Sequence, residues 1–153
     1  MRLVRNMLME DIRKCAEIFT EAYRTLYSEP WTVETAEKRI SEVFNQDKDF
    51  CFVLEIEDSV CGFLAARRFS WYDGVRIWIE EIVVEENCRG QGCGTLLLKS
   101  LKETCKEQGV VGYSLISEKK SKAYIYYINR GFSPSPWVHM KVDEEFFKMD
   151  NNA

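Results

Sequence analysis

A glycine-rich turn between an apolar strand and an amphipathic helix is the feature that most constrains how this chain folds. The turn covers residues 89–95, after the apolar run Ile82–Val84 and the acidic pair Glu80 and Glu81. Glycine allows a positive φ and a close backbone approach to a ligand. The N–H groups of a helix's first turn lack partners within the helix and attract an anion. The unit therefore predicts a site for a phosphate-bearing ligand.

Two common phosphate-binding motifs do not fit this turn. A P-loop needs Gly, four residues, then Gly-Lys-Ser or Gly-Lys-Thr, and no lysine follows a glycine in this chain. A dinucleotide fingerprint needs the spacing G-x-G-x-x-G, whereas Gly90, Gly92 and Gly94 are spaced by two throughout. The turn therefore disfavours nucleoside triphosphates and dinucleotides.

The same turn carries a resemblance to a known family. The pattern Arg89-x-x-Gly92-x-Gly94, with Val84 five residues before it and the amphipathic segment Leu96–Leu101 after it, resembles the acetyl-CoA motif of the GNAT superfamily of N-acyltransferases. This resemblance implies that the anion is the pyrophosphate of acetyl-CoA.

A second match lies downstream. Ala123, then Tyr127, then Gly131-Phe132, with three residues in each gap, resemble the other signature of that family, whose Tyr lies beside the cofactor sulfur. The two motifs occur in the family's order with a predicted strand between them. The start of the chain also suits the family's opening strand and first helix, so the resemblance covers nearly the whole chain.

Hydrophobic periodicity and turn residues predict one domain over residues 1–153, without repeats or linkers. We expect an α/β (α+β) fold with a mixed central sheet and the order β-α-α-β-β-β-α-β-α-β, which agrees with the GNAT-like fold that the resemblance implies. The predicted strands are 3–5, 50–57, 60–69, 75–84, 110–116 and 138–142, and the predicted helices are 9–23, 32–44, 95–108 and 121–129.

Composition excludes several classes of protein. The formal net charge of −4 disfavours a nucleic-acid binder and suits a cationic substrate. No apolar run approaches the ~20 residues that span a bilayer, and charges at Arg5, Glu10 and Asp11 interrupt any signal-like segment. We expect a cytoplasmic protein with no membrane partner, and we leave a homodimer open.

Six cysteines form no C-x-x-C pair, and the lone His139 cannot complete a zinc set with them, so no metal site is expected. We expect reduced thiols that pack mostly as small hydrophobes. Cys88 and Cys93 flank the glycine turn, so oxidation or a mixed disulfide with the cofactor thiol is the alternative. The cysteines are Cys15, Cys51, Cys61, Cys88, Cys93 and Cys105.

The resemblance implies where acetyl-CoA would bind. The pantetheine arm would pair with the strand at Ile82–Val84, and the pyrophosphate would rest on the N–H groups of the glycine turn beside Arg89. Lys120 stands where the family commonly has Asn and would reach a phosphate. The predicted cofactor-binding residues are Ile82, Val83, Val84, Arg89, Gly90, Gln91, Gly92, Cys93, Gly94, Thr95, Lys120 and Ala123.

Attack of an amine on a thioester needs a base, because an alkyl ammonium with a pKa near ~10.4 keeps its proton at neutral pH. Strand alternation predicts Glu80 on one face with Ile82 and Val84, and Glu81 on the other. We assign the base to Glu80, partly because the polyamine branch of the family has an acidic pair here and uses the first member. The alternative is that both glutamates are structural and form salt bridges at the start of the strand. If Glu80 is the base, it could take the proton directly or through a water.

Tyr127 is the predicted acid for the departing thiolate, since it has the family spacing to Gly131-Phe132. A phenol's ordinary pKa of ~10 lies above the ~8.5 of a thiol, so this transfer costs about 2 kcal/mol unless the site favours it. Departure of an unprotonated thiolate is therefore the alternative.

The resemblance implies that the amine binds in a groove formed by the loop between the first two helices, the central strands and the C-terminal segment. The aromatic and acidic side chains of these segments together suit a cation. The leading interpretation is an N-acetyltransferase that transfers an acetyl group from acetyl-CoA to a small-molecule or peptide amine in a ternary complex. Alternatives are a catalytically silent acyl-CoA sensor and an unrelated nucleotide-binding domain. The predicted substrate-binding residues are Tyr27, Glu29, Trp31, Glu81 and Trp137.

Overall fold

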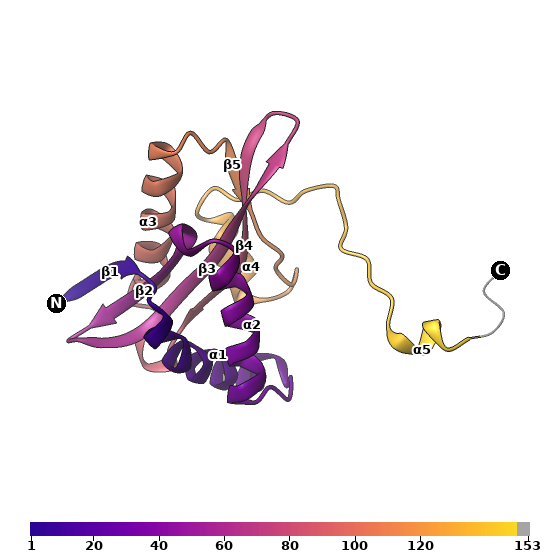
Figure 1. The fold of residues 1–153 in the computed structure, drawn as a ribbon, viewed down its shortest axis with the longest axis horizontal. Helices are drawn as coiled ribbons and strands as arrows, with labels where there is room; N and C mark the ends of the chain where they lie inside the picture. The colour runs from indigo at the N-terminus through magenta and orange to yellow at the C-terminus, as the bar shows by residue number, and fades with distance from the viewer. Residues whose placement is uncertain (150–153) are drawn as a thin grey trace. The chain divides into compact units, whose positions relative to one another are not determined.

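A five-stranded sheet in the order β1-β2-β3-β4-β5 forms the centre of the computed structural model, which describes residues 1–149 (Figure 1). Strands β1 to β4 pair antiparallel, whereas β5 runs parallel to β4. The mixed sheet predicted from the sequence is therefore confirmed. The strands are β1 (Arg2–Asn6), β2 (Cys51–Ile56), β3 (Ser59–Trp71), β4 (Gly74–Val84) and β5 (Gly112–Ser114).

All four predicted helices form, with shifted ends. The first extends past Tyr23 and ends at a left-handed Ser28, and the second is capped by Thr32, whose side chain accepts from the Thr35 N–H at 3.1 Å. The helices are α1 (Ile12–Tyr27), α2 (Val33–Gln46), α3 (Cys93–Glu107), α4 (Lys122–Ile128) and α5 (Glu144–Phe147), and the single-turn 3-10 helices are η1 (Met9–Asp11), η2 (Lys48–Phe50) and η3 (Glu86–Cys88).

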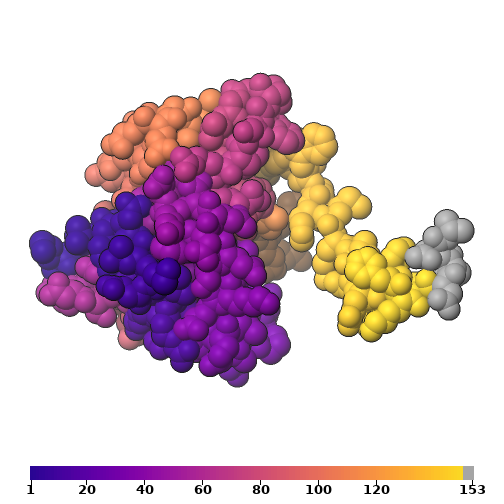
Figure 2. Space-filling model, viewed as in Figure 1, coloured from indigo at the N-terminus to yellow at the C-terminus, as the bar shows by residue number. Residues whose placement is uncertain are grey.

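The chain divides into two compact units, Met1–Leu115 and the part that begins at Ile116. The first unit holds the whole sheet with α1, α2 and α3. Figure 1 shows α1 and α2 on one side of the strands and α3 on the other. In the space-filling view α1 and α2, coloured indigo to purple, lie at the front of this unit (Figure 2).

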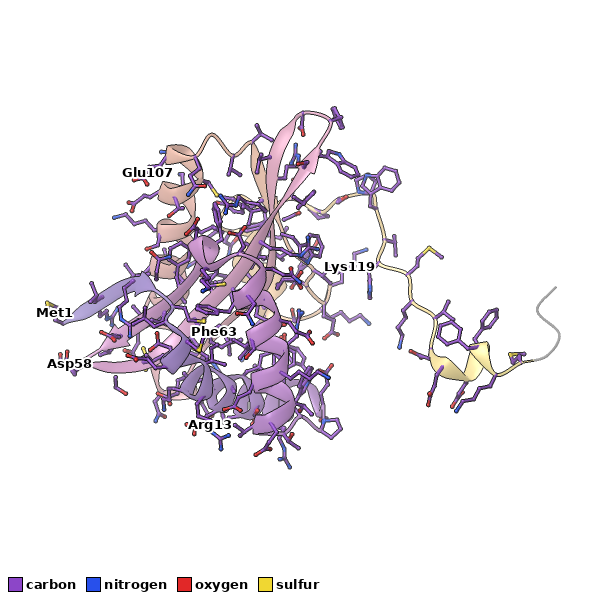
Figure 3. The ribbon with its side chains drawn as sticks, in the orientation of Figure 1. Met1, Arg13, Asp58, Phe63, Glu107 and Lys119 are labelled. Atoms are coloured by element: carbon purple, nitrogen blue, oxygen red, sulfur yellow. The ribbon has the colours of Figure 1, made fainter. Side chains whose placement is uncertain are left out.

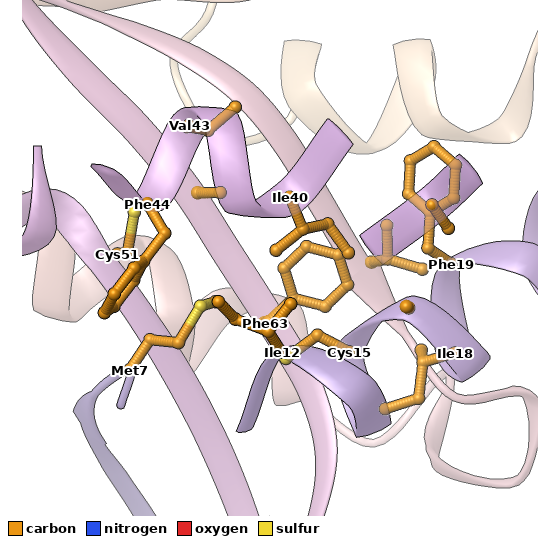
Figure 4. Packing of buried hydrophobic residues seen from close by; sticks show 14 of the residues in the cluster. Met7, Ile12, Cys15, Ile18, Phe19, Ile40, Val43, Phe44, Cys51 and Phe63 are labelled. Atoms are coloured by element: carbon orange, nitrogen blue, oxygen red, sulfur yellow. The ribbon is translucent and has the colours of Figure 1, made fainter. Parts of the chain in front are cut away.

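The core between the sheet and the pair α1 and α2 is the larger of the two apolar layers. Phe63 of β3 is fully buried there, and Phe19, Ile40 and Cys15 pack around it from the helices (Figure 4). The opposite face of the sheet is covered by α3, whose Leu97 and Leu101 are fully buried. Both faces of β3 are therefore covered, which explains the nearly continuous apolar run over 60–66.

The β2–β3 turn lies beside the start of the chain. The Glu57 N–H donates to the Met1 carbonyl at 3.2 Å, and Figure 3 shows Met1 and Asp58 at the same end of the strands. Glu57 and Asp58 both have positive φ, 49° and 63°. This is the geometry of a tight hairpin turn, so the turn is centred one residue earlier than the predicted Asp58-Ser59.

Each long hairpin contains a β-bulge. Between β3 and β4, Ala65 faces Glu81 and Ala66 faces Ile79, so Glu80 is an extra residue on β4. Between β2 and β3, Leu54 faces Gly62 and Glu55 faces Val60, so Cys61 is an extra residue on β3. A bulge bends its strand and redirects side chains.

The second unit contains α4 and α5. Ser121 caps α4 by accepting from the Tyr124 N–H at 3.1 Å, close to the predicted helix start. The strand predicted over 138–142 is wrong, because this segment has no strand in the structure. Its alternating apolar side chains are 57–87% exposed. An alternating pattern alone therefore does not make a strand, because a strand also needs a sheet edge to pair with.

Over residues 1–149 the structure contains no helix with the length and apolar character needed to cross a membrane.

Candidate active site

The glycine turn folds as a left-handed entry into α3. Gly90 and Gly92 have φ values of 72° and 81°, and α3 begins at Cys93, two residues before the predicted start. The first backbone bond of the helix runs from the Leu96 N–H to the Gly92 carbonyl at 3.1 Å. The preceding amides therefore lie ahead of the helix's own hydrogen-bond ladder, where an anion is favoured.

The turn leaves space for a ligand. An added Cβ at Gly90 or Gly92 would meet nothing within 4 Å. Arg89 anchors the turn by donating from Nε to the Val84 carbonyl at 2.9 Å, and its Nη2 is buried without a hydrogen-bond partner among residues 1–149. The nearest acidic atom to that nitrogen is Glu21 Oε2 at 3.8 Å. Open glycines and an incompletely bonded guanidinium fit a phosphate group.

Arg2 holds the turn from the first strand. Its Nη1 donates to the Gln91 carbonyl at 2.5 Å, and the Gln91 amide donates to the Asn87 carbonyl at 2.9 Å. Sequence reasoning did not find this contact, because Arg2 and Gln91 are far apart in the chain.

The strand before the turn has an open edge. Strand β5 pairs only with Arg76–Trp78 of β4, and no described strand pairs with the rest of that edge. The Glu85 N–H bonds to the Cys61 carbonyl on the β3 side at 2.7 Å. Because backbone polar groups alternate sides along a strand, the N–H groups of Ile82 and Val84 face the open edge. This edge can hold an extended amide-containing chain such as pantetheine.

Glu80 and Glu81 lie on the same side of the sheet, so the prediction that strand alternation separates them is wrong. Arg39 of α2 donates from Nη2 to Glu80 at 2.8 Å and to Glu81 at 3.2 Å. Arg67 of β3 donates to Glu80 at 2.8 Å. The bulge at Glu80 is the cause, because an extra residue breaks the period of two that alternation requires.

The two carboxylates titrate differently. Burial works to raise the pKa of Glu80, but the hydrogen bonds from Arg39 and Arg67 outweigh it and hold the pKa below its ordinary value. Burial raises the pKa of Glu81, and the bonds from Tyr23 and Arg39 offset this only in part. Two neighbouring carboxyl groups with opposite shifts are typical of a functional site.

Tyr23 of α1 connects the carboxylates to an aromatic cluster that we define as Phe19, Tyr23, Tyr27 and Trp31. Its hydroxyl donates to Glu81 Oε1 at 2.5 Å, and its ring stacks on Phe19 with centroids 4.1 Å apart. Burial, then the charge of Glu81, raise the pKa of Tyr23, so the phenol keeps its proton.

The predicted substrate residues of the first unit meet at this cluster. Tyr27 and Trp31 lie 5.1 and 6.2 Å from the Tyr23 ring, centroid to centroid. The Trp31 indole donates to Glu29 at 2.9 Å. Tyr27, Glu29, Trp31 and Glu81, which were selected from separate segments, therefore surround Tyr23.

Sequence reasoning missed the roles of Tyr23, Arg39 and Arg67. A signal for Arg39 was present: it lies three residues after Ala36 and four before Val43, on the buried face of α2. A charged residue on an apolar helix face indicates a buried partner.

The remaining predicted residues lie in the second unit. Tyr127 is on α4, and the Phe132 N–H donates to its carbonyl at 3.1 Å, after Gly131 with φ 93°. The Tyr127 and Phe132 rings are 5.2 Å apart. Lys120 precedes α4, Ala123 lies within it, and Trp137 is 88% exposed. The motif from Ala123 to Phe132 thus forms one helix with a glycine at its end.

The comparisons with known proteins agree with this geometry. A search of the curated proteins gave no significant match. The profile of the acetyltransferase (GNAT) family matches residues 13–132, well over half of the chain. The chain belongs to the GNAT acetyltransferase family. It is therefore an acyltransferase enzyme, and the resemblance drawn from the two motifs is confirmed. Enzymes of this family use acetyl-CoA as co-substrate.

Solved structures share the fold of this GNAT acetyltransferase at low sequence identity. A possible acetyltransferase from Clostridium difficile 630 is 17% identical, with a TM-score of 0.79 over 93% of this chain and 97% of that one. Glucosamine-6-phosphate N-acetyltransferase from Arabidopsis thaliana is 20% identical, with a TM-score of 0.67 over 93% and 98%. An aminoglycoside acetyltransferase from an uncultured soil metagenomic sample is 17% identical, with a TM-score of 0.71 over 93% and 95%.

Residues 1–149 of this GNAT chain contain no group of three or more His, Cys, Asp or Glu side chains arranged to hold a metal ion.

Proposed function

We propose that this GNAT enzyme transfers an acetyl group from acetyl-CoA to a primary amine of a small cationic molecule or a Lys side chain, by direct attack in a ternary complex. The observation that carries the proposal is the position of the Glu80 and Glu81 pair. The pair lies on β4 beyond the residues that pair with β5, and Glu81 accepts a hydrogen bond from Tyr23 of the aromatic cluster.

The cofactor side of the proposal rests on the glycine turn and the strand before it. Bound acetyl-CoA supplies the activated acetyl thioester. Backbone groups of Ile82–Val84 orient the pantetheine arm, and the amides of the turn with Arg89 bind the pyrophosphate. The residues proposed to bind it are Ile82, Val83, Val84, Arg89, Gly90, Gln91, Gly92, Cys93, Gly94 and Thr95, with Lys120 and Ala123 of the second unit.

The side chains on the acceptor side of the site suit a cationic substrate. Aromatic faces and carboxylates together favour an ammonium group. Glu81 is held by Tyr23 and Arg39, and its raised pKa limits the charge it presents. Tyr27, Glu29, Trp31, Glu81 and Trp137 are the proposed substrate-binding residues. Two structural neighbours are named for amine-bearing acceptors, an amino sugar phosphate and the aminoglycosides, which supports an amine here.

Glu80 is the proposed proton acceptor. Its pKa lies below the ordinary value, so the carboxylate is charged at neutral pH and ready to take the ammonium proton, directly or through a water. Arg39 and Arg67 hold it in place and make it a weaker base. Tyr127 is the proposed acid for the departing thiolate. We also propose that residues 1–153 act as one N-acetyltransferase domain, located in the cytoplasm.

An amine screen tests the proposal. Purified protein is mixed with acetyl-CoA and, separately, a polyamine, an aminoglycoside and a lysine-containing peptide, and free thiol and acetylated product are both measured. We expect thiol release that depends on one class of amine, and a melting temperature raised by acetyl-CoA. A raised melting temperature with no turnover for any amine would instead support an acyl-CoA sensor. No thermal shift at millimolar acetyl-CoA would reject the cofactor assignment.

A further inference from the structure

Two arginines hold Glu80 and use only part of their hydrogen-bonding capacity to do so. Arg67 donates from Nε to Glu80 Oε1, and Arg39 donates from Nη2 to Glu80 Oε2, each at 2.8 Å. Arg39 Nη2 also donates to Glu81 at 3.2 Å. A guanidinium has five N–H donors. Within residues 1–149, Nη1 and Nη2 of Arg67 and Nε and Nη1 of Arg39 form no hydrogen bond.

These unbonded nitrogens reach solvent. The side chains of Arg39 and Arg67 are 32% and 37% exposed. In the described part of the chain, the buried side-chain atoms without a hydrogen-bond partner are Thr20 Oγ1 and Arg89 Nη2, so the nitrogens of Arg39 and Arg67 are not among them. An arginine that is fixed on one side and open on the other can bind a carboxylate or a phosphate through two parallel hydrogen bonds.

The charges of these four side chains leave room for a further anion. Arg39 and Arg67 are both positive at any pH near neutral. Glu80 is negative, because its pKa lies below the ordinary value, whereas the raised pKa of Glu81 limits the negative charge on that group. Positive charge therefore equals or exceeds negative charge around the pair. An acceptor with an ammonium group alone would leave the free arginine nitrogens without an anionic partner.

The strand register separates the arginine from the aromatic cluster. Ala65 of β3 faces Glu81, and Arg67, two residues further along β3 on the same face, faces Trp78. Tyr23 of the aromatic cluster meets the pair at Glu81. Arg67 therefore lies about 7 Å further along the sheet, toward the β3–β4 turn. The site thus offers an aromatic and acidic end for an ammonium group and an arginine end for an anion.

We propose that the amine acceptor also carries an anionic oxygen group, a carboxylate or a phosphate, which Arg67 and Arg39 bind while the amine lies at Glu80. This inference rests on the proposed acetyl transfer and narrows its substrate. The ammonium end of such a molecule is the cation that the aromatic cluster accepts. Arg67 is then a residue that determines specificity as well as a support for Glu80.

Pairs of amines that differ only by the anionic group test the proposal. The full-length protein is assayed with saturating acetyl-CoA and either 4-aminobutyrate or its amide, and either phosphoethanolamine or ethanolamine. Released thiol and acetylated product are both measured. In at least one pair we expect kcat/KM for the anionic member to be higher by about tenfold or more. The pair that shows this preference distinguishes a carboxylate from a phosphate.

Variants of Arg67 connect the preference to the structure. Both members of a pair present the same amine, so an effect of the variant on Glu80 as a base cancels in the ratio of their kcat/KM values. Arg67→Gln should lower that ratio by about tenfold, and Arg67→Met should do the same if glutamine disturbs Glu80. Arg76→Gln is the matched control, because Asp73 already accepts from the Arg76 Nε at 3.0 Å. It should leave the ratio unchanged.

The possible failures are distinguishable. If the wild type acetylates the neutral members as well as the anionic ones, the proposal is overturned while acetyl transfer stands. A preference for the anionic members that survives in both Arg67 variants, or that falls equally in Arg76→Gln, would overturn the assignment to Arg67. No acetylated product from any amine would overturn the proposed function together with this inference.

Discussion

Glu80 and Glu81 accept hydrogen bonds from the same nitrogen, Nη2 of Arg39, at 2.8 and 3.2 Å. Adjacent residues on a regular strand point to opposite faces, so this relationship exists only because Glu80 is the bulged residue of β4. The bulge gives one guanidinium two carboxylates with opposite pKa shifts. The bulge lies just beyond Trp78, where pairing with β5 ends and the open edge of β4 begins.

The buried Glu81 predicts a pH dependence of stability. Its raised pKa means that the folded state holds the proton more tightly than the unfolded chain. Its stabilising effect is thus fully present below the ordinary carboxyl pKa and is lost as the pH rises through the folded value. Replacing it with glutamine removes this loss. The melting temperature of Glu81→Gln relative to wild type should therefore increase as the pH rises above about 4.

Glu80→Gln is the control of opposite sign. The lowered pKa of Glu80 adds stability above the ordinary carboxyl pKa, and that stability is lost as the pH falls through the folded value. The melting temperature of this variant relative to wild type should therefore decrease with rising pH in the acid range. Parallel melting profiles for wild type and both variants would contradict the assignment of opposite shifts.

The Tyr23 hydroxyl should stabilise the fold through Glu81. Tyr23→Phe keeps the ring that stacks on Phe19 at 4.1 Å and removes only the 2.5 Å hydrogen bond. Because the acceptor is a buried carboxyl, we expect a loss of about 1.5–3 kcal/mol in the free energy of unfolding, measured by urea denaturation. Tyr72→Phe is the control: Tyr72 is 91% exposed, and its change should stay within about 0.5 kcal/mol. Equal changes in the free energy of unfolding for the two variants would show that the hydrogen bond from Tyr23 to Glu81 does not stabilise the fold.

Much of the fold was predictable because the local sequence patterns favour the same conformations that the packed structure contains. The periodic helices, the capping Thr32 and the left-handed Gly92 all occupy the conformations that their residue types favour. The two GNAT motifs identified the family before any contact was known. The predicted strand over 138–142 failed for the opposite reason, since an alternating pattern needs a sheet edge to pair with.

The arrangement of the carboxylates was not predictable by the same means. Nothing in the local run from Ile79 to Ile82 marks a bulge, because the pairing register of β3 decides it. The contacts of Glu80 and Glu81 come from Arg39 and Tyr23, which lie about 40 and 58 positions away in the chain. Such contacts depend on how α1 and α2 pack on the sheet. The sequence indicates them only weakly, through the position of the charged Arg39 on the apolar face of α2.

The proposed base should affect turnover more than cofactor binding. Glu80→Gln keeps the size of the side chain but cannot accept the ammonium proton, so we expect kcat to fall on the order of 10²-fold or more. The acetyl-CoA concentration that half-saturates the thermal shift should remain within a factor of about two. Glu86→Gln changes an exposed carboxylate of η3 and should leave both quantities unchanged. Wild-type turnover in Glu80→Gln would exclude Glu80 as the base.

The glycine turn can be tested with a pair of matched substitutions. Gly92 and Gly109 both have left-handed φ values, 81° and 67°, and both have open space around an added Cβ. Aspartate therefore pays a similar backbone cost of about 1–2 kcal/mol at either position. Only Gly92→Asp places a negative charge at the start of α3, where the pyrophosphate is proposed to bind. We expect it to abolish the acetyl-CoA thermal shift, whereas Gly109→Asp should retain it, and loss of the shift in both would mean that backbone strain alone is responsible.

Tyr127 and Tyr126 offer an internal comparison for the proposed acid. Their rings lie edge to face with centroids 5.4 Å apart on α4, but only Tyr127 has the family spacing to Gly131-Phe132. Tyr127→Phe removes the hydroxyl proton while it preserves the ring beside Phe132 at 5.2 Å. We expect a fall in kcat of about tenfold or more with little change in acetyl-CoA affinity, since proton transfer to the thiolate is lost but packing is kept. Tyr126→Phe should behave as wild type in the same thiol-release assay. Equal kcat values for the two variants would show that the thiolate departs without help from Tyr127.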